Sequence, residues 1–424
     1  MDNKKILIGG WIYFCKSIIK ISAAAITRRM HMTYDFDEII DRRNTNSIKY
    51  DFAKQRGKPE DAIPLWVADM DFKTLPQVTD ALVKISRHGI FGYSEVREEY
   101  FSTLYKWYSD NFGWNIRPQW LVKTPGIVFA IAMAIRAFTQ KGDGVIIQQP
   151  VYYPFSEAIL ANKRVLVNSP LVYDGGVYKI DFEDFEEKIV SGNVKVFILC
   201  NPHNPVGRVW NGEELIRLGE ICLKHGVMVV SDEIHADFIF EGYKHLIFAA
   251  LKPEFANMTI TCTAPSKTFN LAGLQVSNIF IQNVNMKFRF EQEIVKSGYS
   301  QLNTMGLAAC HAAYEYGAEW LSQLKTYLAG NLSFVRSFLT ERLPEIKLVE
   351  PQGTYLIWLD FNELGLSDNA LEDLVANEAR LWLDNGLMFG AEGRGFQRIN
   401  IACPRQILVR AFEQLEAAVS RLRK

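Results

Sequence analysis

Short, continuous runs of apolar residues recur along the middle of the chain, and we interpret them as strands. Runs of this kind are typical of strands that are buried on both faces of a parallel sheet. The predicted strands are residues 145–147, 164–167, 194–200, 227–231, 258–262 and 276–281. Helix-like stretches alternate with them from about residue 75 to residue 319, which predicts a large α/β domain.

One helix-like stretch, residues 213–225, is amphipathic. Leu215, Leu218 and Ile221 fall on one face, and Gly226 follows as a C-cap. The order strand, helix, strand forms a βαβ unit, in which ligands bind beyond the carboxyl ends of the strands.

Toward the C-terminus the pattern changes. Residues 318–343 predict a long helix, the alternating runs 354–359 and 397–401 predict half-buried strands, and residues 407–422 predict a closing helix. This mixture favours a second, smaller α+β domain.

Polar residues follow three of the predicted strands, namely Asn204, Asp232 and Lys267. The carboxyl ends of parallel strands meet at one edge of a sheet, so we expect these side chains to face one crevice. A lysine there is costly unless its amine is neutral, paired or covalently bound. Lys267 is therefore a candidate for Schiff-base chemistry, with a surface lysine in a polar loop as the alternative.

Composition and charge are those of an ordinary globular protein. The chain has 424 residues, enough for two or three domains, and is 48% hydrophobic and 22% charged. Its net charge is −1 without a basic block, so we expect no nucleic-acid or membrane partner. The six cysteines and seven histidines lack metal-ligand spacing, so we expect no metal and a reducing, cytoplasmic location.

Residues 1–31 differ from the rest of the chain. Lys4 and Lys5 precede an apolar stretch that is interrupted by Lys16 and is too short to span a bilayer. We interpret this segment as an upstream extension outside the fold, with Met32 as the true start, and a secretory signal or anchor as the alternative.

The polar clusters and their order along the chain resemble a known family. The motifs that carry the resemblance are residues 64–72, 91–93, 201–207, 231–237, 264–270 and 398–405. From about residue 32 onward, the chain is similar to fold-type I pyridoxal 5′-phosphate (PLP) enzymes of the class I/II aminotransferase superfamily. Within it, the chain looks most like the cystathionine β-lyase branch, the PatB/MalY-type C–S lyases.

The resemblance implies an α/β fold, the PLP-dependent transferase fold type I. A large PLP-binding domain, residues 76–319, would contain a mostly parallel seven-stranded sheet flanked by helices. A smaller α+β domain would be discontinuous and would combine residues 32–75 with residues 320–424.

The resemblance also implies roles for the three polar residues. Lys267 would bind PLP as a Schiff base and later take the substrate Cα proton. Asp232 would pair with the pyridine nitrogen and keep it protonated, although the adjacent Glu233 is easily mistaken for it and a structural loop carboxylate is the alternative. Asn204 would donate to the phenolic oxygen, unless it is an ordinary turn asparagine.

Two further side chains would touch the ring. Tyr152 would stack on PLP, with Tyr153 as the competing candidate. His235 would lie near the phenolic oxygen, where the C–S lyase branch commonly has histidine, but a satisfied structural histidine is the alternative.

Phosphate binding would use backbone donors at a helix start. Gly126, Ile127 and Val128 precede the helical run 129–138, and N–H groups at a helix N-terminus favour an anion. The hydroxyl of Ser266 would contribute, and Thr263 is a further candidate.

The chain departs from the family pattern at one phosphate position. Gln275 stands where an arginine is usual, so we expect the phosphate to be held more by neutral donors. Tyr93 resembles the tyrosine that reaches the phosphate from the neighbouring subunit, which implies an obligatory homodimer with a shared active site.

Arg398 would clamp the α-carboxylate of an amino-acid substrate in two parallel bonds, with Arg405 as a less favoured alternative. Trp66 would line the substrate entrance, and core packing is an almost equal alternative. Asp69 and Asp71 look like loop or capping residues without a catalytic role.

We therefore expect a PLP-dependent C–S β-lyase that converts L-cystathionine, or a cysteine S-conjugate, to a thiol, pyruvate and ammonia. With L-cystathionine this is a step of methionine biosynthesis. One alternative is an aminotransferase of aromatic or neutral amino acids. An alternative of another class is a regulatory binding protein on a PLP-enzyme scaffold, against which the intact Lys267, Asp232, Asn204 and Arg398 argue.

Overall fold

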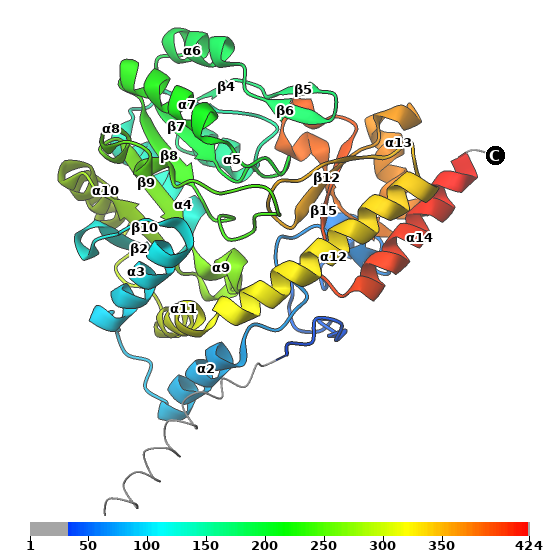
Figure 1. Cartoon of the computed structure of the whole chain (residues 1–424), viewed down its shortest axis with the longest axis horizontal. Coiled ribbons are helices and arrows are strands. Elements are labelled where there is room, and N and C mark those ends of the chain that lie inside the picture. The colour runs from blue at the N-terminus through cyan, green and yellow to red at the C-terminus, as the bar shows by residue number, and fades with distance from the viewer. Residues whose placement is uncertain (1–32, 423–424) are drawn as a thin grey trace, which may run out of the picture. The chain divides into compact units, whose positions relative to one another are not determined.

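A seven-stranded sheet organises the computed structural model, which describes residues 33–422 (Figure 1). Its strand order is β2-β10-β9-β8-β7-β3-β4; β10 is antiparallel to both neighbours and the other pairings are parallel. The strands are β2 (Leu121–Thr124), β3 (Gly144–Ile147), β4 (Val165–Asn168), β7 (Val194–Cys200), β8 (Met228–Asp232), β9 (Thr259–Thr263) and β10 (Ser277–Ile281).

The strand predictions are confirmed for six of these seven strands. The exception, β2, is a four-residue edge strand that contains Lys123, so its apolar run is too short to identify it. The mostly parallel seven-stranded sheet agrees with the predicted fold type.

Helices cover both faces of the sheet (Figure 1). Side chains alternate along β7, so that Val196 and Ile198 face one core while Phe197 and Leu199 face the other. The first core is closed by α4 (Ile127–Phe138), α5 (Pro154–Ala161) and α10 (Val284–Lys296). The second is closed by α6 (Phe182–Ser191), α7 (Gly212–Lys224) and α8 (Pro253–Ala256). This burial on both faces explains why the strands read as continuous apolar runs.

The predicted amphipathic helix is confirmed as α7. Asn211 accepts from the backbone N–H of Glu214, and the Glu214 side chain returns to the backbone of Asn211, which forms a capping box. Gly226 takes the left-handed conformation after the helix, with φ of 65°.

A second, four-stranded antiparallel sheet has the order β11-β12-β15-β14. Its strands are β11 (Lys347–Val349), β12 (Leu356–Asp360), β14 (Asp384–Asn385) and β15 (Phe396–Asn400). The long helix α12 (Ala318–Arg342) packs against the closing helix α14 (Arg405–Leu422), where the rings of Phe338 and Phe412 lie 5.6 Å apart. Both helices were predicted from the sequence.

The remaining α-helices and strands complete the fold. They are α2 (Pro76–His88), α3 (Glu98–Phe112), α9 (Pro265–Thr268), α11 (Thr304–Tyr316), α13 (Asp368–Asp373), β1 (Ile63–Pro64), β13 (Leu381–Trp382) and the hairpin of β5 (Val172–Asp174) and β6 (Val177–Lys179). Phe36–Lys424 forms one compact unit, and the division into a large and a small domain stays a prediction.

Some sequence predictions fall outside the described residues, namely those for residues 1–31 with Cys15. The other five cysteines are free and buried. Within residues 33–422, no helix is long and apolar enough to cross a membrane.

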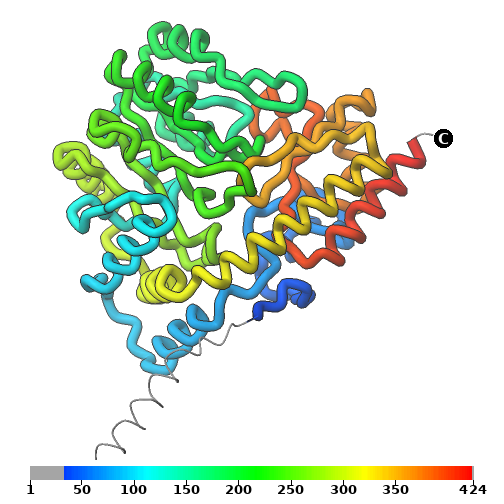
Figure 2. Tube along the Cα trace, viewed as in Figure 1, coloured from blue at the N-terminus to red at the C-terminus, as the bar shows by residue number. Residues whose placement is uncertain are grey.

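Segments from the two ends of the unit lie side by side (Figure 2). β1 pairs in parallel with β13, and the backbone N–H of Asn400 donates to the carbonyl of Leu65. The chain then continues as the 66–72 segment, whose carbonyls are held by side chains from distant parts of the sequence.

Polar side chains fix nearly every carbonyl of the 66–72 segment. Asn400 donates to the carbonyls of Val67 and Asp69 at 2.7 and 2.8 Å. Asn270, in the left-handed conformation, donates to those of Met70 and Phe72 at 3.0 and 2.9 Å. Asn270 lies three residues after Lys267, and Asn400 lies two residues after Arg398. The hydrogen bonds of the 66–72 segment therefore connect the two stretches of chain that carry these predicted site residues.

Two cations neutralise the acidic residues of this segment. The amine of Lys49 is fully buried and lies 2.8 Å from a carboxylate oxygen of Asp71. Arg42 pairs with both Asp69 and Asp71. The two aspartates are thus partners in an ion network in which Lys49 and Asp71 are buried and Arg42 and Asp69 are partly exposed. The sequence predicted them only as loop or capping residues.

Replacing Lys49 with methionine is expected to lower the free energy of unfolding by about 3–5 kcal/mol, because Asp71 would lose a buried partner. Chemical denaturation of the purified variant measures the change. Lys179→Met, in an exposed pair with Asp174, is the control and is expected to unfold close to wild type. Equal denaturation midpoints for Lys49→Met and wild type would contradict the assignment of Lys49 as a stabilising buried partner of Asp71.

Candidate active site

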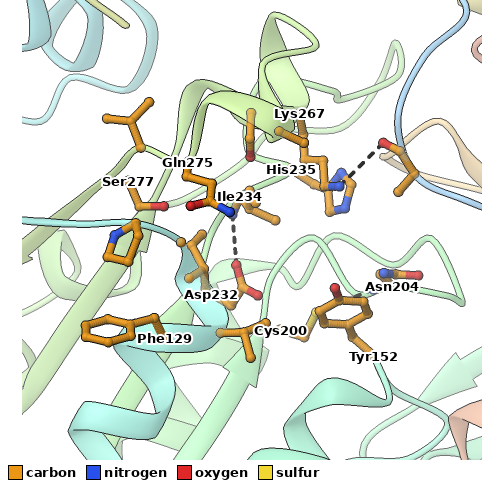
Figure 3. A pocket seen from close by; sticks show the side chains of 18 residues that line it. Phe129, Tyr152, Cys200, Asn204, Asp232, Ile234, His235, Lys267, Gln275 and Ser277 are labelled. Atoms are coloured by element: carbon orange, nitrogen blue, oxygen red, sulfur yellow. Dashed lines mark hydrogen bonds between the residues drawn. The ribbon is translucent and has the colours of Figure 1, made fainter. Parts of the chain in front are cut away.

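A cavity of about 360 Å³ opens at the carboxyl ends of β7 and β8 (Figure 3). Asn204, Asp232 and Lys267 all line it, as the sequence predicted. The cavity is also bounded by the N-terminus of α4 and by the loop that follows α9. Its volume lies in the range of small-molecule sites.

Lys267 enters the cavity from α9, the short helix that follows β9. Its amine donates to the carbonyl of Ala68 at 3.4 Å, a long hydrogen bond. Burial lowers the pKa of this amine to about 8. A useful fraction of Lys267 is therefore neutral near physiological pH, and it can act as a nucleophile or base rather than as a surface cation.

Asp232 is the acid that faces the cavity, at the end of β8. One of its oxygens accepts from the backbone N–H of Ile234 at 3.1 Å, and burial raises its pKa to about 7. Glu233 points elsewhere, because its oxygens accept from His245 and from the N–H of Phe248. The structure therefore places the first acid of the pair at the site.

Two aromatic side chains line the same cavity, His235 and Tyr152. Burial, with a smaller contribution from the nearby cations, holds the pKa of His235 well below its ordinary value, so the imidazole is neutral. Its Nδ1 has no hydrogen-bond partner in the described protein, and its ring meets Tyr355 edge to face at 5.7 Å. Tyr153 packs instead against Phe389, at 5.9 Å between ring centroids.

The N-terminus of α4 supplies backbone donors to the cavity. Gly126 is the N-cap, and Ile127 and Val128 are the first helical residues; all three line the cavity with Ser266. A Cβ at Gly126 would meet no atom within 4 Å, so the space before this peptide is open to a ligand. The hydroxyl of Thr263 is engaged elsewhere, because it donates to a carbonyl of β10 at 2.7 Å.

Arg398 is buried on β15 beside the cavity. Its Nη1 donates to Oδ1 of Asn204 at 3.0 Å, and its Nη2 donates to the carbonyl of Trp66 at 2.9 Å. The same Nη2 forms an ion pair with Asp384. Arg405 lies elsewhere, where its Nε donates to the side chain of Asn331 at 2.6 Å.

Trp66 and Tyr93 do not reach the cavity within this chain. The indole of Trp66 is buried and stacks on Trp382, with 4.5 Å between ring centroids, which is the core-packing alternative. Tyr93 is 95% exposed and lines a neighbouring recess of about 660 Å³. Gln275 lines both the recess and the cavity, so the two spaces adjoin.

Sequence reasoning missed four residues at or beside the site. Ala68 acts through its carbonyl, which leaves no signal in the side-chain pattern. Tyr355 donates to that carbonyl at 2.7 Å, and Cys200 lines the cavity at the end of β7. Asp384 meets Arg398 only because β14 pairs with β15, which the sequence pattern does not indicate.

The assembled groups favour organic chemistry on an anionic, carboxylate-bearing ligand. A partly neutral amine faces a carboxyl group, helix N–H groups point at open space, and a guanidinium lies beside an amide. Within residues 33–422, no cluster of three or more His, Cys, Asp and Glu side chains could hold a metal ion. A carbonyl-containing cofactor that binds an amine suits this donor set.

The low pKa of Lys267 gives a pH prediction. In the cofactor-free protein, we expect labelling of Lys267 by an amine reagent to rise with pH and to reach half its maximum near pH 8, because only the neutral amine reacts. A lysine with the ordinary pKa of 10.5 would still be almost unreactive there. Peptide mass spectrometry across pH 6–11 measures it, and a half-point near 10.5 would refute the shift.

Comparison with known proteins places this fold and site in one family. The profile described as Aminotransferase class I and II matches residues 60–415. The chain is 42% identical to cystathionine beta-lyase PatB of Bacillus subtilis, over 91% of this chain and 100% of that protein. Cystalysin from Treponema denticola, whose crystal structure contains PLP, is 39% identical with a TM-score of 0.89 over 92% of this chain and 100% of that chain. The PLP-bound C-S lyase from Staphylococcus hominis is 35% identical with a TM-score of 0.85 over 91% and 98%. The chain therefore belongs to the aminotransferase class I and II family and has the fold of the fold-type I PLP enzymes.

Proposed function

We propose that this protein is a PLP-dependent C–S β-lyase that splits L-cystathionine, or a related cysteine S-conjugate, into a thiol, pyruvate and ammonia. The observation that carries the proposal is the partly neutral amine of Lys267, which shares a cavity with Asp232 and Asn204. The names of the similar proteins, cystathionine beta-lyase and C-S lyase, support this reaction.

The donor set of the cavity fits PLP group by group. The amine of Lys267 would bind the aldehyde carbon, Asp232 would pair with the pyridine nitrogen, and Asn204 would donate to the phenolic oxygen. The amides of residues 126–128 and the hydroxyl of Ser266 would hold the phosphate in the open space before Gly126.

The two aromatic side chains complete the fit. Tyr152 would stack on the ring of the cofactor. His235 is neutral and its Nδ1 lacks a partner in the part of the chain that the structure describes, so it would serve the phenolic side as an uncharged hydrogen-bonding group. Gln275, in place of an arginine, keeps the phosphate end of the cavity free of a cation at that position.

Each residue of the site would have a separate role in the elimination reaction. When bound, PLP supplies an electron sink for the negative charge that develops on the substrate Cα. Arg398 would hold the α-carboxylate, and Asp232, when ionised, would keep a positive charge on the ring nitrogen. The neutral amine of Lys267 would accept the Cα proton, and the carbonyl of Ala68 would keep that amine oriented.

The bond changes of the proposed reaction balance. The Cα–H electron pair forms the new Cα–Cβ double bond, and the Cβ–S bond breaks with its electron pair leaving on the thiolate. The proton held at Lys267 Nζ is then available to the leaving group. The released aminoacrylate takes up one water to give pyruvate and ammonia.

Residues 32–424 with PLP are expected to release homocysteine and pyruvate from L-cystathionine in equal amounts, over many turnovers and without any keto acid. Lys267→Ala is expected to lower turnover by about 10³-fold or more, because it removes both the covalent anchor and the base. Lys179→Ala, on the exposed hairpin, is the control. Product that appears only when a keto acid is added would assign the protein to the aminotransferases instead.

We further propose a homodimer in which Tyr93 completes the cavity of the second subunit. Ile90, Phe91 and Tyr93 are 71%, 63% and 95% exposed, which is unusual for neighbouring apolar side chains. Phe91 and Tyr93 line the recess, which adjoins the cavity through Gln275. A second copy of this chain would cover these side chains and bring a tyrosine toward the phosphate end.

Hybrid dimers test this sharing. Lys267→Ala and Tyr93→Ala subunits, differently tagged and co-expressed, are expected to give hybrids with about half of the wild-type turnover, because one of the two cavities regains both side chains. Each parent dimer is expected to be much less active. Hybrids that are no more active than the parents would show that the two residues do not act across subunits.

A further inference from the structure

Asp384 is a buried acid to which the proposed reaction assigns no role. It lies on β14 directly opposite Arg398 on β15, as a cross-strand pair of the antiparallel ladder. The two side chains are only 3% and 4% exposed and form an ion pair. Because the pairing of two strands sets their distance, Asp384 stays with Arg398 whether or not a ligand is present.

The hydrogen bonds of Arg398 are largely committed before any substrate arrives. A guanidinium has five N–H donors. One on Nη1 reaches Asn204, and Nη2 serves both the carbonyl of Trp66 and Asp384. The Nε donor is buried and has no hydrogen-bond partner among residues 33–422. Arg398 therefore has a fixed orientation and a compensated charge, with donors left over for a ligand.

An uncompensated guanidinium in such a dry site would hold a carboxylate very tightly, because charges attract strongly where water is excluded. Burial raises the pKa of Asp384 and Arg398 opposes that rise, so the ionised form of Asp384 depends on Arg398. A substrate carboxylate that approaches Arg398 must share the guanidinium with Asp384. Tight binding of the substrate ground state gives no gain in turnover. Sharing the charge of Arg398 with Asp384 therefore weakens the hold on the carboxylate and favours its release.

We propose that Asp384 is a positioning residue that orients Arg398 and, by sharing its charge, sets the affinity of the site for the α-carboxylate. This inference rests on the proposed function only in taking Arg398 as the carboxylate-binding group. It assigns two separable effects to one side chain: orientation, through an oxygen acceptor, and charge compensation, through ionisation.

The two effects predict opposite outcomes for two substitutions. Asp384→Asn keeps an oxygen that accepts from Nη2 but removes the charge, so the affinity for a carboxylate is expected to rise about tenfold. Asp384→Ala removes the acceptor as well, so Arg398 loses its orientation and the affinity is expected to fall about tenfold despite the freed charge.

Equilibrium binding to the holoenzyme measures both effects without turnover. The probes are L-alanine, which has no leaving group on Cβ, and L-alaninamide, which lacks the carboxylate. The ratio of their dissociation constants isolates the carboxylate contact, and thermal unfolding of each variant reports whether it folds. Asp373→Asn is the matched control, because it makes the same chemical change at an exposed aspartate that accepts a hydrogen bond from Asn377. It is expected to leave the ratio unchanged.

An unchanged or reduced preference for L-alanine in Asp384→Asn would overturn the proposal and leave Asp384 a purely structural partner. If Asp384→Ala does not fold, Asp384→Asn alone decides, because tighter binding is not expected from a structural defect. A wild-type holoenzyme that does not distinguish L-alanine from its amide would overturn it too. Failure of the β-lyase assay is a separate result, since the binding ratio does not depend on which reaction follows.

Discussion

The carbonyl of Ala68 is the contact on which the arrangement of the site depends. It accepts from Lys267, which lies on α9, and from Tyr355, which directly precedes β12. The segment that carries it is held by Asn270, Asn400 and buried cations, so the carbonyl cannot move without breaking several hydrogen bonds. A backbone position fixed in this way determines where the lysine amine lies.

The same burial that packs the site adjusts its proton affinities. Exclusion of water lowers the pKa of Lys267 to about 8 and raises that of Asp232 to about 7, so both groups titrate near neutral pH. His235 stays neutral between them for the same reason. Desolvation thus gives one cavity a partly neutral amine, a carboxyl group that titrates near neutral pH and an uncharged imidazole.

The charged side chains around the site are compensated in two separate sets of ion pairs. Arg398 is compensated by Asp384, while the aspartates of the 66–72 segment are compensated by Arg42 and Lys49. Removing one member of either set leaves its partner exposed to a low dielectric, which is why residues far from the reacting atoms affect the site. Arg398 also donates to Asn204, in the loop after β7, which connects this compensated pair to the central sheet.

The apolar pattern alone identifies six of the seven strands of the large sheet and the polar residues that follow three of them. Continuous apolar runs identify strands buried on both faces, and a polar residue after each run marks the carboxyl edge, so Asn204, Asp232 and Lys267 were predictable. Contacts between segments that are distant in the sequence become apparent in the folded structure. The Ala68 carbonyl has no side-chain signature, Asp384 reaches Arg398 through a strand pairing, and the Trp66 indole turned to the core because Trp382 offers a stacking face. Local pattern sets burial and periodicity, whereas contacts between distant segments depend on packing that no local pattern encodes.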